Sequence, residues 1–107
     1  MKKAIQRIIN YAVQTADPDK IILFGSMSDG THNVYSDLDL LIILDNVFLK
    51  KQIIEQIKHF ADKFAISADV VVYSNAAVEK EVKVTNSFLA GVLKSGKIVY
   101  QKDTNLF

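Results

Sequence analysis

The sequence Ile-Ile-Leu-Phe-Gly-Ser at residues 21–26 is followed, after a gap of ten residues, by Asp-Leu-Asp-Leu-Leu-Ile-Ile-Leu at residues 37–44. Each stretch contains a continuous apolar run, which is typical of a strand buried on both faces of a sheet. These two strands decide the fold, because the remaining helices and strands must pack around them.

Two carboxylates mark the start of the second strand. Side chains at positions i and i+2 of a strand point to the same face, so Asp37 and Asp39 should lie about 7 Å apart on one side of the sheet. Neither lysine nor arginine adjoins them in the sequence. Because two neighbouring carboxylates repel each other when buried without a positive charge, we expect a divalent cation between them, Mg²⁺ or Mn²⁺.

The dipeptide Gly25-Ser26, at the end of the first strand, suggests which ligand the cation would help to bind. Glycine allows the backbone to turn sharply out of the strand, and the serine hydroxyl can cap a short helix that follows. Free backbone N–H groups at a helix start attract phosphate. A phosphate site beside a carboxylate pair indicates phosphoryl or nucleotidyl transfer.

Gly25-Ser26, the ten-residue gap and Asp37-Leu38-Asp39 together resemble the signature of the polymerase-beta-type nucleotidyltransferase superfamily. The short chain resembles its minimal nucleotidyltransferase branch over nearly its whole length. The resemblance implies an α/β (α+β) domain, a two-layer nucleotidyltransferase fold with helices packed on a small mixed β-sheet. It also implies that Gly25 and Ser26 bind ATP, with Mg²⁺ or Mn²⁺ on the carboxylates. Members of this branch are often encoded beside a HEPN-domain ribonuclease toxin, as its antitoxin.

A third carboxylate, Asp69, interrupts the β-branched run of residues 68–73. In the superfamily a third acid comes from a strand neighbouring the Asp-x-Asp strand, and Asp69 matches that position. The resemblance implies that it binds metal, accepts the proton of the acceptor hydroxyl, or does both. The alternative interpretation is an ordinary charge on an edge strand.

The loop after Ser26 departs from the family pattern. Many minimal nucleotidyltransferases resemble Gly-Ser-Arg-x-Arg-Gly, whereas this chain has Met27, Ser28 and Asp29 before Gly30. The arginines expected to help hold phosphate are missing, and Arg7 is the only arginine in the chain. A partner protein could supply them.

The rest of the sequence predicts alternating helices and strands. Apolar spacing indicates helices from Ile5 to about Ala16, over residues 48–64, and over one long segment from Ser74 to Ser95 that ends at a left-handed Gly96. Short strands are expected at residues 20–24, 68–73 and 97–100, and a flexible tail over residues 101–107.

Length and composition limit the function. The 107 residues suit a single domain, 1–107, with no room for a separate acceptor-binding domain. A net charge of +1 gives no reason to expect direct nucleic-acid binding, and the absence of cysteine excludes thiolate zinc sites. No apolar run approaches the roughly 20 residues of a membrane span, so we expect a cytoplasmic protein, as a monomer or in a homo- or hetero-oligomer.

Three functional hypotheses remain. The first is an active nucleotidyltransferase that transfers AMP from ATP to a hydroxyl, by resemblance a tyrosine of a HEPN-type toxin. The second is a weak or inactive antitoxin that neutralises a toxin by binding alone. The third is a nucleotidyltransferase acting on a small molecule, which the short chain disfavours.

Overall fold

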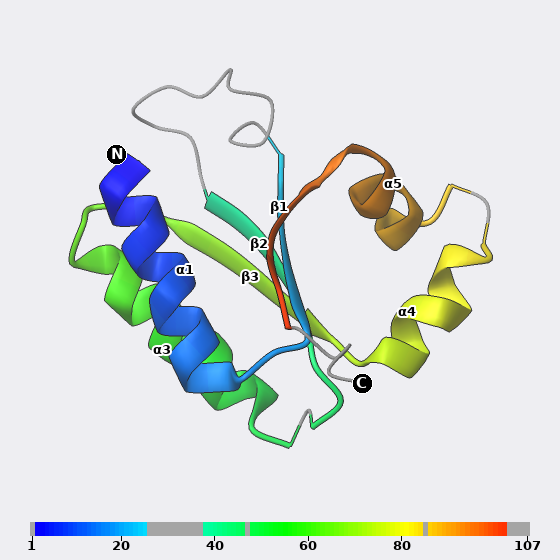
Figure 1. The fold of residues 1–107 in the computed structure, drawn as a ribbon, viewed down its shortest axis with the longest axis horizontal. Coiled ribbons are helices and arrows are strands. Elements are labelled where there is room, and N and C mark those ends of the chain that lie inside the picture. Colours follow the sequence, from blue (N-terminus) through cyan, green and yellow to red (C-terminus); the bar gives the residue numbers. More distant parts are fainter. Residues whose placement is uncertain (1, 26–37, 47, 85, 103–107) are drawn as a thin grey trace.

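The computed structural model describes residues 2–25, 38–46, 48–84 and 86–102, and Figure 1 shows their arrangement. Along the chain, the described helices and strands are α1 (Lys2–Ala16), β1 (Lys20–Phe24), β2 (Leu38–Ile43), α3 (Lys50–Asp62), β3 (Ala68–Tyr73), α4 (Asn75–Val82), α5 (Phe88–Ser95) and β4 (Lys97–Gln101). The short helix expected from Ser26 and the loop that follows it up to Asp37 lie outside the described residues. None of the described helices is long and apolar enough to cross a lipid bilayer.

The four described strands form one mixed sheet in the order β3-β2-β1-β4. β1 pairs antiparallel with both β2 and β4, whereas β2 pairs parallel with β3. A parallel pair requires a crossover connection, and α3 lies in the segment between β2 and β3. The two stretches that open the sequence analysis thus become β1 and β2, the two central strands.

Helices cover both faces of this sheet (Figure 1). Alternate residues of β1 divide between two core clusters: Ile21 packs in the cluster that includes residues of α1 and α3, and Ile22 packs with Leu89 and Val92 of α5. This division explains why residues 21–23 of β1 and 40–43 of β2 are all apolar, because both of their faces are covered. The predicted fold class, an α+β domain with helices on a small mixed sheet, is confirmed, and the sheet lies between two helical layers.

The last helical segment differs from the prediction. One long helix was expected, but the structure has α4 and α5, separated by a turn. Asn86 in this turn has φ of 63°, and the Ser87 hydroxyl accepts a hydrogen bond of 3.1 Å from the backbone N–H of Ala90. A left-handed asparagine followed by a serine N-cap starts a new helix, although the apolar spacing continues across the break.

Gly96 was predicted to end the last helix in a left-handed conformation, and this is wrong. Its φ and ψ are −76° and 165°, which any residue can adopt. The absence of a side chain matters instead, because a Cβ at Gly96 would lie 2.5 Å from the carbonyl oxygen of Val92 and 2.6 Å from Cγ2 of Ile22. Glycine therefore permits the end of α5 to lie directly against β1.

The prediction of a flexible tail over residues 101–107 is wrong for its first two residues. Gln101 belongs to β4, and the backbone N–H of Lys102 donates a 2.9 Å hydrogen bond to the carbonyl oxygen of Asp19. The ammonium group of Lys102 also lies 3.1 Å from Oδ1 of Asp17. These contacts hold residues 101 and 102 against the start of β1, and residues 103–107 lie outside the described part of the chain.

Candidate functional site

Asp39 and Asp69 lie side by side at one end of the sheet. They are register partners in the parallel pairing of β2 with β3. Adjacent strands lie about 4.8 Å apart, and register partners present their side chains to the same face. Alternation along the strands places both carboxylates on the face covered by α5, which Leu41 and Ile43 also share. Asp39 is half-buried and Asp69 is exposed, so this acid pair, Asp39 and Asp69, can be reached from solvent.

Gly25 brings the backbone at the end of β1 against the acid pair. Its φ is +78°, a conformation that L side chains rarely adopt. A Cβ at this position would collide with Oδ2 of Asp39 and would lie 3.2 Å from its Cγ. Phe24, just before it, is the register partner of Asp39. The turn after β1 and the start of β2 therefore meet at one point.

Two of the predicted site residues, Ser26 and Asp37, lie outside the described residues. Within the described ranges, no three His, Cys, Asp or Glu side chains gather closely enough to hold a metal ion. The acid pair supplies two carboxylates at an accessible surface. Such hard oxygen donors suit Mg²⁺ or Mn²⁺, so the described part of the site fits the expected cation. The metal-binding roles of Asp37, Asp39 and Asp69 and the phosphate-binding role of Gly25 and Ser26 stay predictions.

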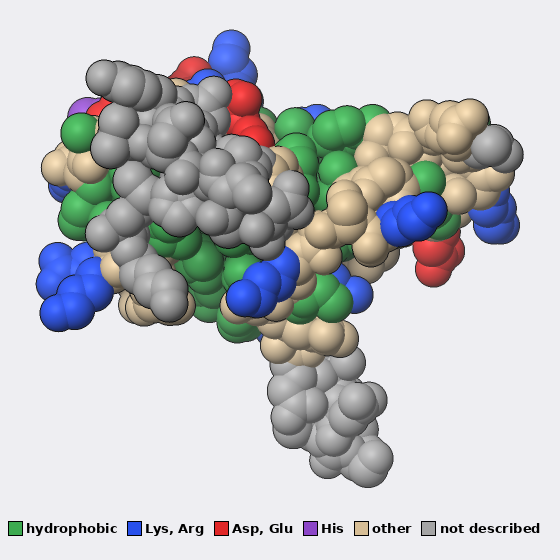
Figure 2. Space-filling view, turned by 90° about the horizontal axis from the view of Figure 1, so that it is seen from above, with side chains coloured by type: hydrophobic (Ala, Val, Ile, Leu, Met, Phe, Trp, Pro, Cys, Tyr) green, Lys and Arg blue, Asp and Glu red, His purple; other side chains and the backbone are tan. Residues whose placement is uncertain are grey.

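Phe24 neighbours Asp39 and in turn contacts Phe88, and the sequence pattern assigned neither aromatic residue to the site. Phe24 stands beside Asp39 on the same face of the sheet, and its ring meets the ring of Phe88 edge to face, with centroids 5.6 Å apart. Phe88 is the first residue of α5 and is 49% exposed. Figure 2 looks down on this end of the molecule and shows hydrophobic side chains beside acidic ones on the described surface. The position of Phe24 directly before Gly25 was the only sequence feature that could have pointed to it. The face of the sheet on which its side chain lies could be known only from the strand register.

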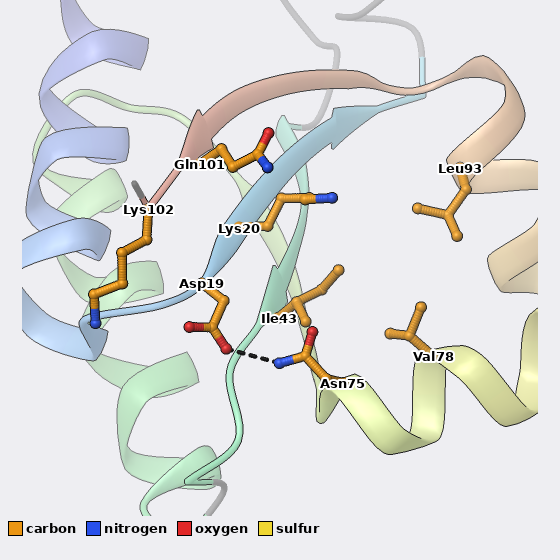
Figure 3. Close-up of a pocket in the computed structure, with 8 residues that line it drawn as sticks. All are labelled: Asp19, Lys20, Ile43, Asn75, Val78, Leu93, Gln101 and Lys102. Atoms are coloured by element: carbon orange, nitrogen blue, oxygen red, sulfur yellow. Dashed lines mark hydrogen bonds between the residues drawn. The ribbon is translucent and has the colours of Figure 1, made fainter. Parts of the chain in front are cut away.

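An open cavity of about 420 Å³ lies at the other end of the sheet (Figure 3). Its lining includes Lys20 and Ile43, which pair with each other at the opposite end of β1 and β2 from Phe24 and Asp39. Asn75 also lines it, and its side-chain amide donates to Oδ2 of Asp19 at 2.7 Å and to Oδ1 of Asp45 at 3.0 Å. These bonds tie the start of α4 to the sheet. The cavity is therefore separate from the acid pair.

Asp45, in the turn after β2, also contacts the backbone of α4. Its Oδ1 accepts from the backbone N–H of Asn75 at 3.4 Å, at the start of α4, while α3 begins without a side-chain cap bond. The carboxylate thus serves a helix that is distant in the sequence.

Comparisons with known proteins place this geometry in a family context. A family model described as "Polymerase beta, Nucleotidyltransferase" matches residues 6–105. Two proteins of Methanocaldococcus jannaschii, each named "Putative protein adenylyltransferase", are 33% identical to this chain. The first match covers 78% of this chain and 58% of the relative, and the second covers 76% and 77%. The chain thus spans little more than half the length of the first relative.

Solved structures show the same fold. A crystal structure of a toxin–antitoxin with AMP-PNP contains a chain that matches with a TM-score of 0.57 and 22% identity, over 91% of this chain and 73% of that one. A nucleotidyltransferase from Sulfolobus solfataricus, described as putative, matches with a TM-score of 0.56 and 18% identity, over 97% of this chain and 83% of the other.

Proposed function

Because this chain belongs to the polymerase beta nucleotidyltransferase family, we propose that it transfers AMP from ATP to a tyrosine hydroxyl of a HEPN-type toxin and so acts as its antitoxin. The observation that carries the proposal is the contact of Gly25 with Asp39 beside Asp69. The names of the two archaeal relatives and the toxin–antitoxin fold match support it. We place the reaction in the cytoplasm, where ATP and a toxin acting on RNA would both be found.

The proposed reaction is a displacement at the α-phosphate. The acceptor oxygen forms a bond to the α-phosphorus while the bond from that phosphorus to the oxygen bridging the β-phosphate breaks, and pyrophosphate leaves with that oxygen. Asp69, the exposed member of the acid pair, takes the proton from the acceptor hydroxyl. Gly25 lets the backbone at the end of β1 approach the Asp39 carboxylate closely, because any side chain there would meet that carboxylate.

The residues of this chain also fit the cation that the family implies. Asp37, Asp39 and Asp69 would hold Mg²⁺ or Mn²⁺ in this proposal. When bound, the cation neutralises charge on the triphosphate and on the departing pyrophosphate. The protein's own part is to hold Asp39 at the end of β2, a strand paired on both sides by β1 and β3, so that the donor atoms are arranged before ATP arrives.

A partner protein solves the positioning problem that this small chain leaves open. The acid pair lies at the rim of the sheet, where Asp69 is exposed, and the cavity of about 420 Å³ lies at the opposite end. A tyrosine presented by another folded protein can be brought to Asp69 from outside. AMP on that tyrosine would add bulk and negative charge where a ribonuclease must admit RNA phosphate.

The intact mass of the partner tests this function. The chain is incubated with Mg²⁺, ATP and the toxin, and the toxin is then weighed by mass spectrometry. We expect a gain of one adenylyl group with the wild type and with Asp62→Asn, an exposed acid at the end of α3, but none with Asp39→Asn. Neutralisation of the toxin without any mass gain would overturn the proposal in favour of an antitoxin that acts by binding alone.

A further inference from the structure

A row of three register partners crosses the sheet at the candidate site. Phe24 on β1 pairs with Asp39 on β2, which pairs with Asp69 on β3. All three side chains face α5, because Phe24 shares its face with Ile22 and the acid pair shares its face with Leu41. Phe24 is therefore the neighbour of Asp39 on this face, with Asp69 one strand further away, and the Phe88 ring contacts the Phe24 ring at a centroid distance of 5.6 Å.

Phe88 combines exposure with a fixed position. Its neighbour Leu89 is fully buried, and Ser87 caps the helix that begins at Phe88. The rings of Phe88 and Phe24 meet edge to face at an interplanar angle of 81°, and 49% of the Phe88 surface stays exposed. Exposed aromatic residues held in a defined geometry next to a polar site are typical of surfaces that bind planar ligands.

We propose that Phe88, supported by Phe24, stacks against the base of the nucleotide whose phosphates lie at the acid pair. This inference rests on the proposed function and adds the residue that holds the nucleoside. If the triphosphate lies over Asp39 and Gly25, the base of the same nucleotide must lie close to the row of Phe24, Asp39 and Asp69. Among the described residues, Phe88 is the exposed aromatic ring next to that row. Stacking of a base on an aromatic side chain is favourable for every base.

The chemistry of phenylalanine limits what this contact can select. A phenyl ring has no hydrogen-bonding group, so it responds to the area of the base rather than to its edge. The Ser87 hydroxyl beside it is already the acceptor of a helix-capping bond. The contact therefore favours purine over pyrimidine nucleotides and distinguishes adenine poorly from guanine.

Binding measurements separate the base contact from the phosphate contact. Calorimetry with Mg²⁺ is performed with ATP and with inorganic tripolyphosphate, which has no base. Phe88→Ala should weaken ATP binding by about 5- to 150-fold, the equivalent of one stacked base, and leave tripolyphosphate binding unchanged. Phe48→Ala is the matched control, since Phe48 is 94% exposed in the turn after β2, far from Asp39. Phe88→Trp should retain ATP binding.

The other possible results contradict either this inference or the proposed function. Equal loss of ATP and tripolyphosphate binding in Phe88→Ala would overturn the inference, because Phe88 would then act through the phosphate site. Unchanged ATP binding together with weaker toxin binding would also overturn it and assign Phe88 to the partner interface. A wild-type chain that binds tripolyphosphate but binds UTP more tightly than ATP would overturn the inference, because stacking on Phe88 favours the larger purine base. A wild-type chain that binds neither ligand would overturn the proposed function itself.

Discussion

Asp39 on β2 and Asp69 on β3 are direct partners in the parallel pairing of the two strands, so two carboxylates stand side by side on one face of the sheet. Like charges at directly neighbouring strand positions destabilise a sheet by roughly 0.2–1 kcal/mol. Neither carboxylate belongs to the hydrophobic core, since the flanking Leu38 and Leu40 of β2 pack in the cluster on the opposite face of the sheet. A cation at this pair would turn the repulsion into binding energy.

Replacing Asp69 by Asn should affect the chemical step more than the fold or nucleotide affinity. Loss of the proton acceptor should lower the turnover number by roughly 100-fold or more, with little change in ATP affinity. The free energy of unfolding should stay constant or rise by up to about 1 kcal/mol because the repulsion with Asp39 disappears. Steady-state kinetics and denaturant unfolding check the two parts. Full turnover in the variant would make Asp69 a structural residue.

Replacing Asp39 by Asn should remove the Mg²⁺ dependence of ATP binding. Asp39 sits between Gly25 and Asp69, so its charge is central to any cation held at the site. The amide keeps the shape of the carboxylate, and circular dichroism should show an intact fold. Titrations of ATP with and without Mg²⁺, with Asp62→Asn as the control, provide the measurement. Equal Mg²⁺ dependence in wild type and Asp39→Asn would contradict the assignment.

Alanine at Gly25 and alanine at Gly91 should have opposite effects on the free energy of unfolding. Gly25→Ala places a side chain at φ of +78° and against the Asp39 carboxylate, so unfolding should become easier by about 1–3 kcal/mol, with loss of nucleotide binding. Gly91→Ala adds a methyl group within α5, where no atom lies within 4 Å, and should stabilise the protein by about 0.5–1 kcal/mol. Denaturant unfolding of both variants gives the comparison. Similar changes in the two would show that Gly25 is not constrained.

The break between α4 and α5 depends on Ser87. Ser87→Ala removes the hydroxyl that accepts from the N–H of Ala90 and should lower the free energy of unfolding by about 1 kcal/mol. Ser95→Ala is the control, because the Ser95 hydroxyl donates to the carbonyl oxygen of Gly91 at the other end of the same helix, a contact of small value. An equal effect of the two substitutions in thermal unfolding would argue against an N-cap at Ser87.

The ion pair of Lys102 with Asp17 predicts a pH dependence in the alkaline range. The hydrogen bond to Asp17 and its charge raise the pKa of the Lys102 ammonium group above its ordinary value. The stabilisation is therefore complete below the unfolded-state pKa and is lost as the pH rises through the folded-state pKa. In Lys102→Met this part of the alkaline loss of stability should be absent. If the free energy of unfolding fell equally with rising pH in wild type and in Lys102→Met, the ion pair would not stabilise the fold.

The sequence alone could predict the strands and the residue types of the site. The apolar runs around Ile22 and Leu41 give strands buried on both faces, and resemblance places Asp69 on the neighbouring strand. The pairing of Asp69 with Asp39 could not be derived, because it depends on the register between strands joined by a long crossover through α3. The place of Phe88 beside Phe24 depends on the same tertiary arrangement.

The errors have local physical causes. The helix break at Asn86 was missed because Val82 and Leu89 both pack on the α5 face of the sheet, so the apolar spacing continues across the turn. Gly96 was assigned a left-handed conformation from its place after a helix, whereas its actual constraint is the contact with Ile22 on β1. Both depend on how α5 packs against the sheet, which local sequence patterns do not record.

Transfer of radiolabel from ATP tests the central claim most directly. The chain, Mg²⁺ and the toxin are incubated with ATP labelled at the α-phosphate or, in parallel, at the γ-phosphate. Adenylyl transfer predicts that the α-label appears on the toxin, that the γ-label leaves as pyrophosphate, and that Asp39→Asn abolishes the transfer. The γ-label on the toxin, or a neutralised toxin that carries neither label, would contradict the account.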